Sequence, residues 1–264
     1  MKILYVSRLF TGLSEVASDR VWEPRGVPTV YRLIEALDRG KHELEIAFTV
    51  REGDSKPFCR ERYNVHVDGL GCAINLLTSG STLPTWLGRA RGYISEAGRF
   101  WSIWRLYRKF RPDLLYFDRA NIYQAALFAR VTSTPIVWRV MGVTSGMRII
   151  LSSNNLFSQV TRWAYRSPFS QVICSLDGSG GGAWMARALL PCVPRVMKLN
   201  GAEVTVRGDL SSAILERLPD RNSTWVLFVA RLVEQKGCMT FIEGFLDAIL
   251  SEPAGLHAIV VGDG

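Results

Sequence analysis

One stretch of the sequence joins an apolar run to a helical pattern and carries two cations. Residues 228–237 read FVARLVEQKG, with Arg231 at the end of the apolar run and Lys236 just before Gly237. In open α/β sheets, ligands bind beyond the carboxyl ends of the strands. The start of a helix offers free N–H groups to an anion, an arginine can fork onto phosphate oxygens, and a lysine acts as a point charge. The pattern predicts a phosphate site, and a solvated turn with two surface cations fits the same residues.

The elements that would position such a site alternate along the chain. Short, nearly continuous apolar runs favour parallel strands that are covered on both faces. We predict these strands at residues 2–7, 44–50, 64–70, 113–117, 135–141, 171–175 and 196–199. Helical patterns lie between them, at residues 28–39, 122–131 and 156–166. This alternation predicts the α/β class with a doubly wound parallel sheet.

The alternation of strand and helix patterns is interrupted once, by a polar stretch at residues 201–222. We predict a complete Rossmann-like domain over residues 1–200, a linker over 201–222, and the start of a second Rossmann-like domain over 223–264. The last part contains only two strand patterns around one helical pattern. Such a unit cannot bury both faces of its strands, so we expect the sequence to be truncated within its second domain.

Residues 228–237 resemble the signature of the family 4 retaining glycosyltransferases, which have the GT-B fold. Two further stretches resemble that family: Leu199–Glu203 is similar to its "NGVD" element, and the sequence ends in the Gly-Asp-Gly that typically closes its next strand. The resemblance implies a two-domain GT-B architecture. It also implies that Arg231, Lys236 and Gly237 bind the diphosphate of a nucleotide sugar.

The resemblance extends to the N-terminal half with less specificity. It implies a loop near the acceptor and the diphosphate, which corresponds here to residues 8–27 and includes Gly12, Arg25 and Gly26. An ordinary surface loop fits those residues equally well.

Four more residues are expected in the cleft by the same resemblance: Met141, Gly142, Asn200 and Glu203. Members of the family often carry a histidine where Met141 and Gly142 stand. Since methionine neither transfers a proton nor donates a hydrogen bond, we assign no catalytic residue.

The resemblance implies an enzyme that transfers a sugar from a nucleotide-diphosphate-sugar donor to an acceptor hydroxyl with retention of configuration. It implies no metal and no cofactor beyond the nucleotide sugar as co-substrate. The acceptor could be a glycan, a lipid-linked sugar or a small molecule. Two alternatives stay open: a truncated, inactive module that binds an acceptor or a membrane, and another GT-B enzyme such as a sugar-nucleotide epimerase.

The positive charge is concentrated in one segment. The chain has a formal net charge of +8, and residues 86–111 contain seven basic residues against the single acid Glu96, together with seven aromatic residues. This composition fits a core helix with solvated arginines, and it also fits the surface of an anionic membrane. No recognised nucleic-acid module accompanies the segment, so we expect no nucleic-acid partner.

The cysteines and histidines point away from metal and disulfide chemistry. The five cysteines are scattered without a C-x-x-C pair, and the three histidines lack metal-ligand spacing. The N-terminus does not have the pattern of a signal peptide. We therefore expect a cytoplasmic protein without a metal site, with peripheral attachment to the inner face of the membrane through residues 86–111 as one option.

Overall fold

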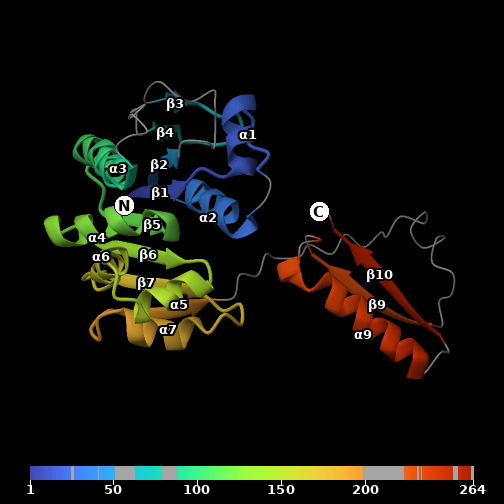
Figure 1. Ribbon diagram of the computed structural model, residues 1–264. Helices are drawn as coiled ribbons and strands as arrows, with labels where there is room; N and C mark the ends of the chain where they lie inside the picture. The colour runs from blue at the N-terminus through green and yellow to red at the C-terminus, as the bar shows by residue number, and fades with distance from the viewer. Residues whose placement is uncertain are drawn as a thin grey trace. The chain divides into compact units, whose positions relative to one another are not determined.

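The chain divides into two compact units, Met1–Glu203 and Val204–Gly264 (Figure 1). The computed structural model describes residues 1–24, 27–40, 42–50, 63–78, 88–198, 223–230, 232, 234–251 and 255–262. The predicted linker, residues 201–222, lies outside these ranges, and the predicted domain boundaries stay predictions.

The first unit is built on an eight-stranded sheet. Its strands are β1 (Lys2–Arg8), β2 (Glu43–Val50), β3 (Tyr63–Val65), β4 (Ile74–Thr78), β5 (Leu114–Asp118), β6 (Ile136–Val140), β7 (Gln171–Ser175) and β8 (Arg195–Lys198). They lie in the order β3-β4-β2-β1-β5-β6-β7-β8, and every neighbouring pair is parallel except β3 with β4. The predicted α/β class with a mostly parallel sheet is confirmed.

Helices cover both faces of this sheet. Alternate residues of a strand point to opposite faces, and β1 accordingly supplies Leu4 and Val6 to one core cluster and Ile3 and Tyr5 to the other. The first cluster includes residues of α3 (Gly88–Phe110), α4 (Ile122–Val131), α5 (Ser145–Ser152), α6 (Leu156–Tyr165) and α7 (Gly181–Ala188), and the second includes residues of α1 (Thr11–Asp19) and α2 (Pro28–Arg39).

Two helices match their predicted bounds because their local signals are strong. Helix α2 begins at Pro28, where proline fits the first turn, and it buries Val30 and Ile34 one turn apart. Helix α4 spans Ile122–Val131 and buries half of its residues.

Two expectations for the first unit are wrong. The expected loop over residues 8–27 contains helix α1, which buries Leu13 and Val16 against the sheet. The expected strand at residues 64–70 is only β3, because Asp68 pairs with Val21 instead and its N–H donates to Arg20 O at 2.8 Å.

The second unit is a strand, a helix and a strand. Strands β9 (Thr224–Val229) and β10 (Leu256–Val261) are parallel, and α9 (Cys238–Ser251) follows the short helix η4 (Glu234–Lys236). The Trp225 and His257 rings stack at 4.6 Å between centroids, and Phe228 stacks on Phe241 of α9 at 5.0 Å. Among the described residues of this unit, none is buried.

Candidate functional site at the carboxyl ends of the strands

A cavity of about 560 Å³ lies at the carboxyl ends of three strands of the first unit. Strand β1 ends at Arg8, β5 ends at Asp118, and Met141 directly follows β6. The cavity is lined by these three residues together with Leu9, Phe10, Ser14, Val27, Val30, Arg119 and Ala120. This is the edge of a parallel sheet at which ligands bind.

The carboxylate of Asp118 joins the ends of β1 and β5 beneath this cavity. Its Oδ2 accepts hydrogen bonds from Ser7 Oγ at 2.6 Å and from the Arg8 N–H at 3.2 Å. Its Oδ1 accepts from the Ala120 N–H and from Asn121 Nδ2, both at 3.1 Å. Burial raises the pKa of Asp118, and these donors act against that rise. With four donors on its two oxygens, Asp118 positions the strand ends and is poorly placed to shuttle protons.

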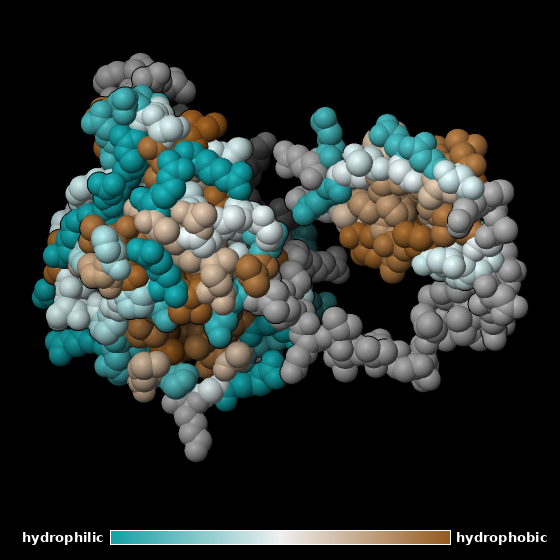
Figure 2. Space-filling view, turned by 90° about the horizontal axis from the view of Figure 1, so that it is seen from below, coloured by the Kyte–Doolittle hydropathy of each residue, from teal (hydrophilic) through white to brown (hydrophobic). Residues whose placement is uncertain are grey.

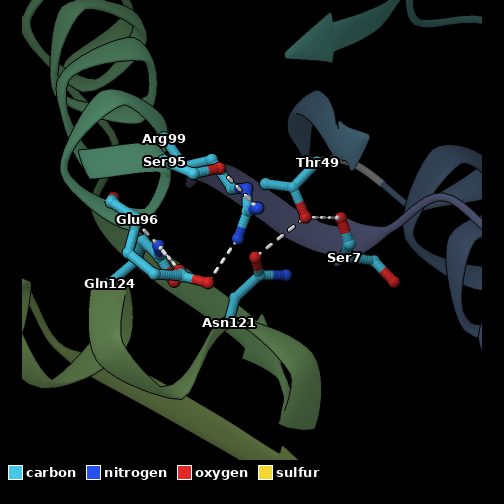
Figure 3. A network of polar contacts seen from close by, with 7 residues as sticks. All are labelled: Ser7, Thr49, Ser95, Glu96, Arg99, Asn121 and Gln124. Atoms are coloured by element: carbon cyan, nitrogen blue, oxygen red, sulfur yellow. Dashed lines mark hydrogen bonds and ion pairs between the residues drawn. The ribbon is translucent and has the colours of Figure 1, made fainter. Parts of the chain in front are cut away.

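Asn121, which donates to this carboxylate, also takes part in the polar contacts drawn in Figure 3. Asn121 Oδ1 accepts from Thr49 Oγ1 at 2.9 Å, which ties β2 to the short helix η3 (Arg119–Asn121). In the same view, Gln124 of α4 donates to Glu96 of α3 at 2.6 Å, and Glu96 also pairs with Arg99. These bonds hold η3 against β2 and α4 against α3.

The rim of the cavity carries positive charge. Arg8 is partly buried and Arg119 is exposed, and Phe10 and Ser14, on either side of Gly12, place the first turn of α1 at the cavity. A helix start carries partial positive charge. This rim can hold an anionic group, and Ser14 adds a hydroxyl.

The loop after β6 is fixed by glycine. Gly142 has φ +99°, and a Cβ at this position would lie 2.2 Å from Asp177 Oδ2. The other Asp177 oxygen accepts from the Ser179 N–H at 3.0 Å, and Ser179 Oγ in turn accepts from the Val143 N–H at 2.8 Å. A side chain at Gly142 would therefore strain the backbone and push the Asp177 carboxylate aside, which disfavours a histidine at this position.

The predicted diphosphate residues belong to the second unit. Lys236 is exposed and ends η4, and it has no ion pair among the residues that the structure describes. Gly237 has φ +73°, its N–H donates to Glu234 O at 3.0 Å, and its O accepts from the Phe241 N–H at 2.9 Å. The left-handed glycine thus turns the chain into α9 directly after the cation.

The predicted site residues divide into three groups. Gly12, Met141 and Gly142 lie at or beside the cavity, and Lys236 and Gly237 lie at the start of α9. The remaining five, Arg25, Gly26, Asn200, Glu203 and Arg231, lie outside the described residues.

Four polar lining residues were not singled out from the sequence: Arg8, Ser14, Asp118 and Arg119. Arg8 and Ser14 lie within the expected loop over residues 8–27. The available signal was a polar residue directly after an apolar run, which marks the carboxyl ends of β1 and β5. In the described ranges, no three histidine, cysteine or acidic side chains gather as metal ligands. None of the described helices has the length and apolar character that crossing a membrane requires.

Comparison with solved structures identifies the fold. Sucrose-phosphate synthase from Thermosynechococcus elongatus aligns with 99% of this chain at 13% identity and a TM-score of 0.61, and 62% of that protein is covered. The apo form of the lipopolysaccharide outer core galactosyltransferase WaaB aligns with 100% of this chain at 12% identity and a TM-score of 0.55, with 61% of that protein covered. No protein-family model matches the sequence, and no curated protein matches it.

These similarities show a GT-B fold that spans a little over three fifths of the length of the two solved proteins. At such low identity they show the fold alone. Chemistry must be argued from the residues of this chain.

Proposed function

We propose that the protein is a glycosyltransferase that moves a sugar from a nucleotide-diphosphate-sugar to an acceptor hydroxyl. The observation that carries this proposal is a cation-rimmed cavity at the carboxyl ends of β1, β5 and β6 in a GT-B fold. Retention of the anomeric configuration and independence of metal are part of the proposal.

In this proposal the first unit binds the acceptor in the cavity. Arg8 and Arg119 are the charged groups that could meet an acidic or phosphorylated acceptor, and Ser14 could accept or donate a hydrogen bond to a sugar hydroxyl. Met141 and Val30 supply an apolar wall. A pocket that combines apolar walls with a few placed polar groups is usual for small ligands.

The second unit is proposed to bind the donor diphosphate through Arg231, Lys236 and Gly237. The exposed ammonium of Lys236 stands directly before a glycine-initiated helix. A cation and a helix start together stabilise the charge that develops on a leaving diphosphate, and such electrostatic stabilisation is often the largest catalytic contribution.

The test measures glycosyl transfer with purified protein and a panel of nucleotide sugars and sugar acceptors. Arg231→Ala and Lys236→Ala should each lower kcat/KM at least tenfold, about 1.4 kcal/mol of transition-state stabilisation. Arg187→Ala, which removes an exposed cation from α7, is the control and should leave kcat/KM unchanged.

Two further measurements complete this test. A chelator should leave the rate unchanged, and NMR of the product should show the donor's anomeric configuration. Equal kinetics of the two α9-side variants and the Arg187 control would remove the diphosphate assignment.

A second proposal concerns where the protein works. The outward stripe of α3 consists of Ile94, Ala97, Trp101, Arg105 and Arg108, all exposed and spaced three or four residues apart. Glu96, the single acid of α3, is paired with Arg99 and Gln124 instead. An apolar and cationic stripe without acids suits an anionic membrane surface, and we propose peripheral association with such a surface on the cytoplasmic side.

A further inference from the structure

A second cavity of the first unit, of about 420 Å³, lies between the C-terminal ends of α3 and α4. It is lined by Trp104, Tyr107, Arg108, Arg111, Pro112, Val131, Thr132 and Ser133. The two helices are joined here by packing and by a hydrogen bond: Trp104 and Tyr107 contact the ring of Phe128, and Tyr107 Oη lies 3.0 Å from Thr134 Oγ1. The cavity is therefore part of a fixed interface.

The cavity has unpaired positive charge. Within the ranges that the structure describes, neither Arg108 nor Arg111 makes an ion pair or a hydrogen bond through its guanidinium. The nearest acid in sequence, Asp113, does not line the cavity, and its Oδ2 accepts from the Lys2 N–H at 2.7 Å. Two helix C-termini bring about −0.5 charge each, so two guanidinium groups leave the cavity net positive.

The backbone at Arg111 is unusual. Arg111 has φ +52°, in the left-handed region that glycine favours at the end of a helix. Its N–H caps α3 by donating to Tyr107 O at 2.8 Å. An arginine stands where glycine would be easier to accommodate, and its side chain lines the cavity. Such an outlier is a reason to look for a ligand.

Two exposed apolar side chains are available beside these arginines, one in the lining of the cavity and one on α3 before it. Val131 at its edge is 55% exposed, and Trp101, one turn before Arg105 on α3, is 59% exposed. A nucleic acid would satisfy the arginines but not these side chains, whereas a lipid surface satisfies both.

We propose that this cavity is a binding site for the phosphate group of an anionic lipid headgroup. The guanidinium groups of Arg108 and Arg111 would clasp the phosphate oxygens, the hydroxyl of Ser133 would face the glycerol, and Val131 with Trp101 would enter the lipid interface. This inference rests on the proposed membrane association and adds a specific site to it.

Cosedimentation with vesicles tests the site. The protein should bind phosphatidylglycerol vesicles and not phosphatidylcholine vesicles at low salt. Arg108→Gln/Arg111→Gln should weaken binding at least tenfold. Lys109→Gln/Arg187→Gln removes the same charge from exposed residues that neither line the cavity nor belong to the outward stripe of α3, and it should weaken binding no more than threefold.

A third variant separates the effect of the backbone conformation at Arg111 from the effect of its charge. Arg111→Gly should keep or raise the thermal stability, because glycine accepts the left-handed conformation, and yet should lose vesicle binding. Equal losses in the two double variants would overturn the site and leave the general membrane association standing. Absence of wild-type binding to phosphatidylglycerol at low salt would overturn both.

Competition and binding experiments with soluble ligands identify the source of the phosphate. Glycerol 3-phosphate should compete with the vesicles more effectively than sodium sulfate of equal ionic strength. Thermal stabilisation by inorganic phosphate without vesicle binding would assign the cavity to a free anion, and tight binding of a DNA duplex that depends on Arg108 and Arg111 would assign it to nucleic acid. Either result would overturn the lipid assignment.

Discussion

The two units share one building plan, parallel strands connected by helices, and they differ in what covers the strands. In the first unit the five central residues of β1 are all buried, with helices on both faces (Figure 1). In the second unit no described residue is buried, and Leu227 and Val229 of β9 are 61% and 65% exposed. Figure 2 shows hydrophobic residues gathered on this second unit.

The comparison shows that the tendency of a sequence to form a strand and the stability of the resulting strand are separate properties. β9 is as apolar as β1, and α9 covers only the face that carries Phe228. The other face, with Leu227, Val229 and Val261, has no cover among the described residues of its own unit. An apolar run indicates that a parallel strand requires cover on both of its faces. Whether the strand is covered depends on how the other elements pack against it.

The largest expected effect is on local unfolding. Amides of β1 and β5 should exchange only through global unfolding, and those of β9 and β10 through openings that cost at least about 5 kcal/mol less, because buried contacts set the cost of opening. Hydrogen exchange followed by mass spectrometry on the purified monomer measures this difference. Equally slow exchange in both units would contradict the comparison.

Two glycines with a left-handed backbone conformation, Gly142 in the first unit and Gly237 in the second, allow the packing difference to be tested at single residues. Gly142→Ala should lower the free energy of unfolding by about 3 kcal/mol, since it combines backbone strain with loss of the Asp177 contact. Gly237→Ala meets nothing within 4 Å and should cost only the strain, about 1 kcal/mol. Gly182→Ala, in open space on α7, is the control and should be neutral or stabilising in chemical denaturation.

An effect between those of the two glycines concerns Asp118 and its pH dependence. Burial raises its pKa above the ordinary value of 3.8, so its contribution to stability is complete below that value and is lost as the pH rises through the raised pKa. Asp118→Asn removes this dependence and leaves one or more buried donors unpaired, at a cost of about 2 kcal/mol.

Denaturation at pH 4 and pH 8 measures the effect of Asp118→Asn. The variant should be less stable than the wild type at pH 4, and the gap should narrow by pH 8. A gap that widens with pH would mean that the four donors outweigh burial. Exchange in β9 and β10 should be unchanged by this substitution.

Much of the fold could be predicted from the sequence because its strongest signals are local. The apolar strands, the proline at the start of α2 and the restart of the rhythm after residue 223 are all visible in one dimension. Helix α1 was missed because it has only nine residues and a glycine in its first turn. β4 was missed because its neighbours in the sheet, β2 and β3, decide that it is a strand.

The location of the candidate site could be predicted from the sequence, but most of its lining residues could not. The carboxyl edge of the sheet follows from the order of the elements, and Met141 and Gly142 were expected there. Asp118 and Arg8 could not be singled out, because a polar residue after a strand acquires its role only when β1 and β5 become neighbours. The arginines of the second cavity were visible as charge, but their convergence with α4 depends on tertiary packing.

The central position of β1 also bears on how the protein is made. Its partner on one side, β2, follows within about 40 residues, whereas on the other side Ile3 pairs with Leu114. While the ribosome synthesises the chain, this side of β1 stays open until β5 has emerged. An open apolar strand edge is a template for wrong pairing. The first unit therefore has an open strand edge on the ribosome for a long interval, during which a chaperone would protect it most and slow translation would prolong the exposure.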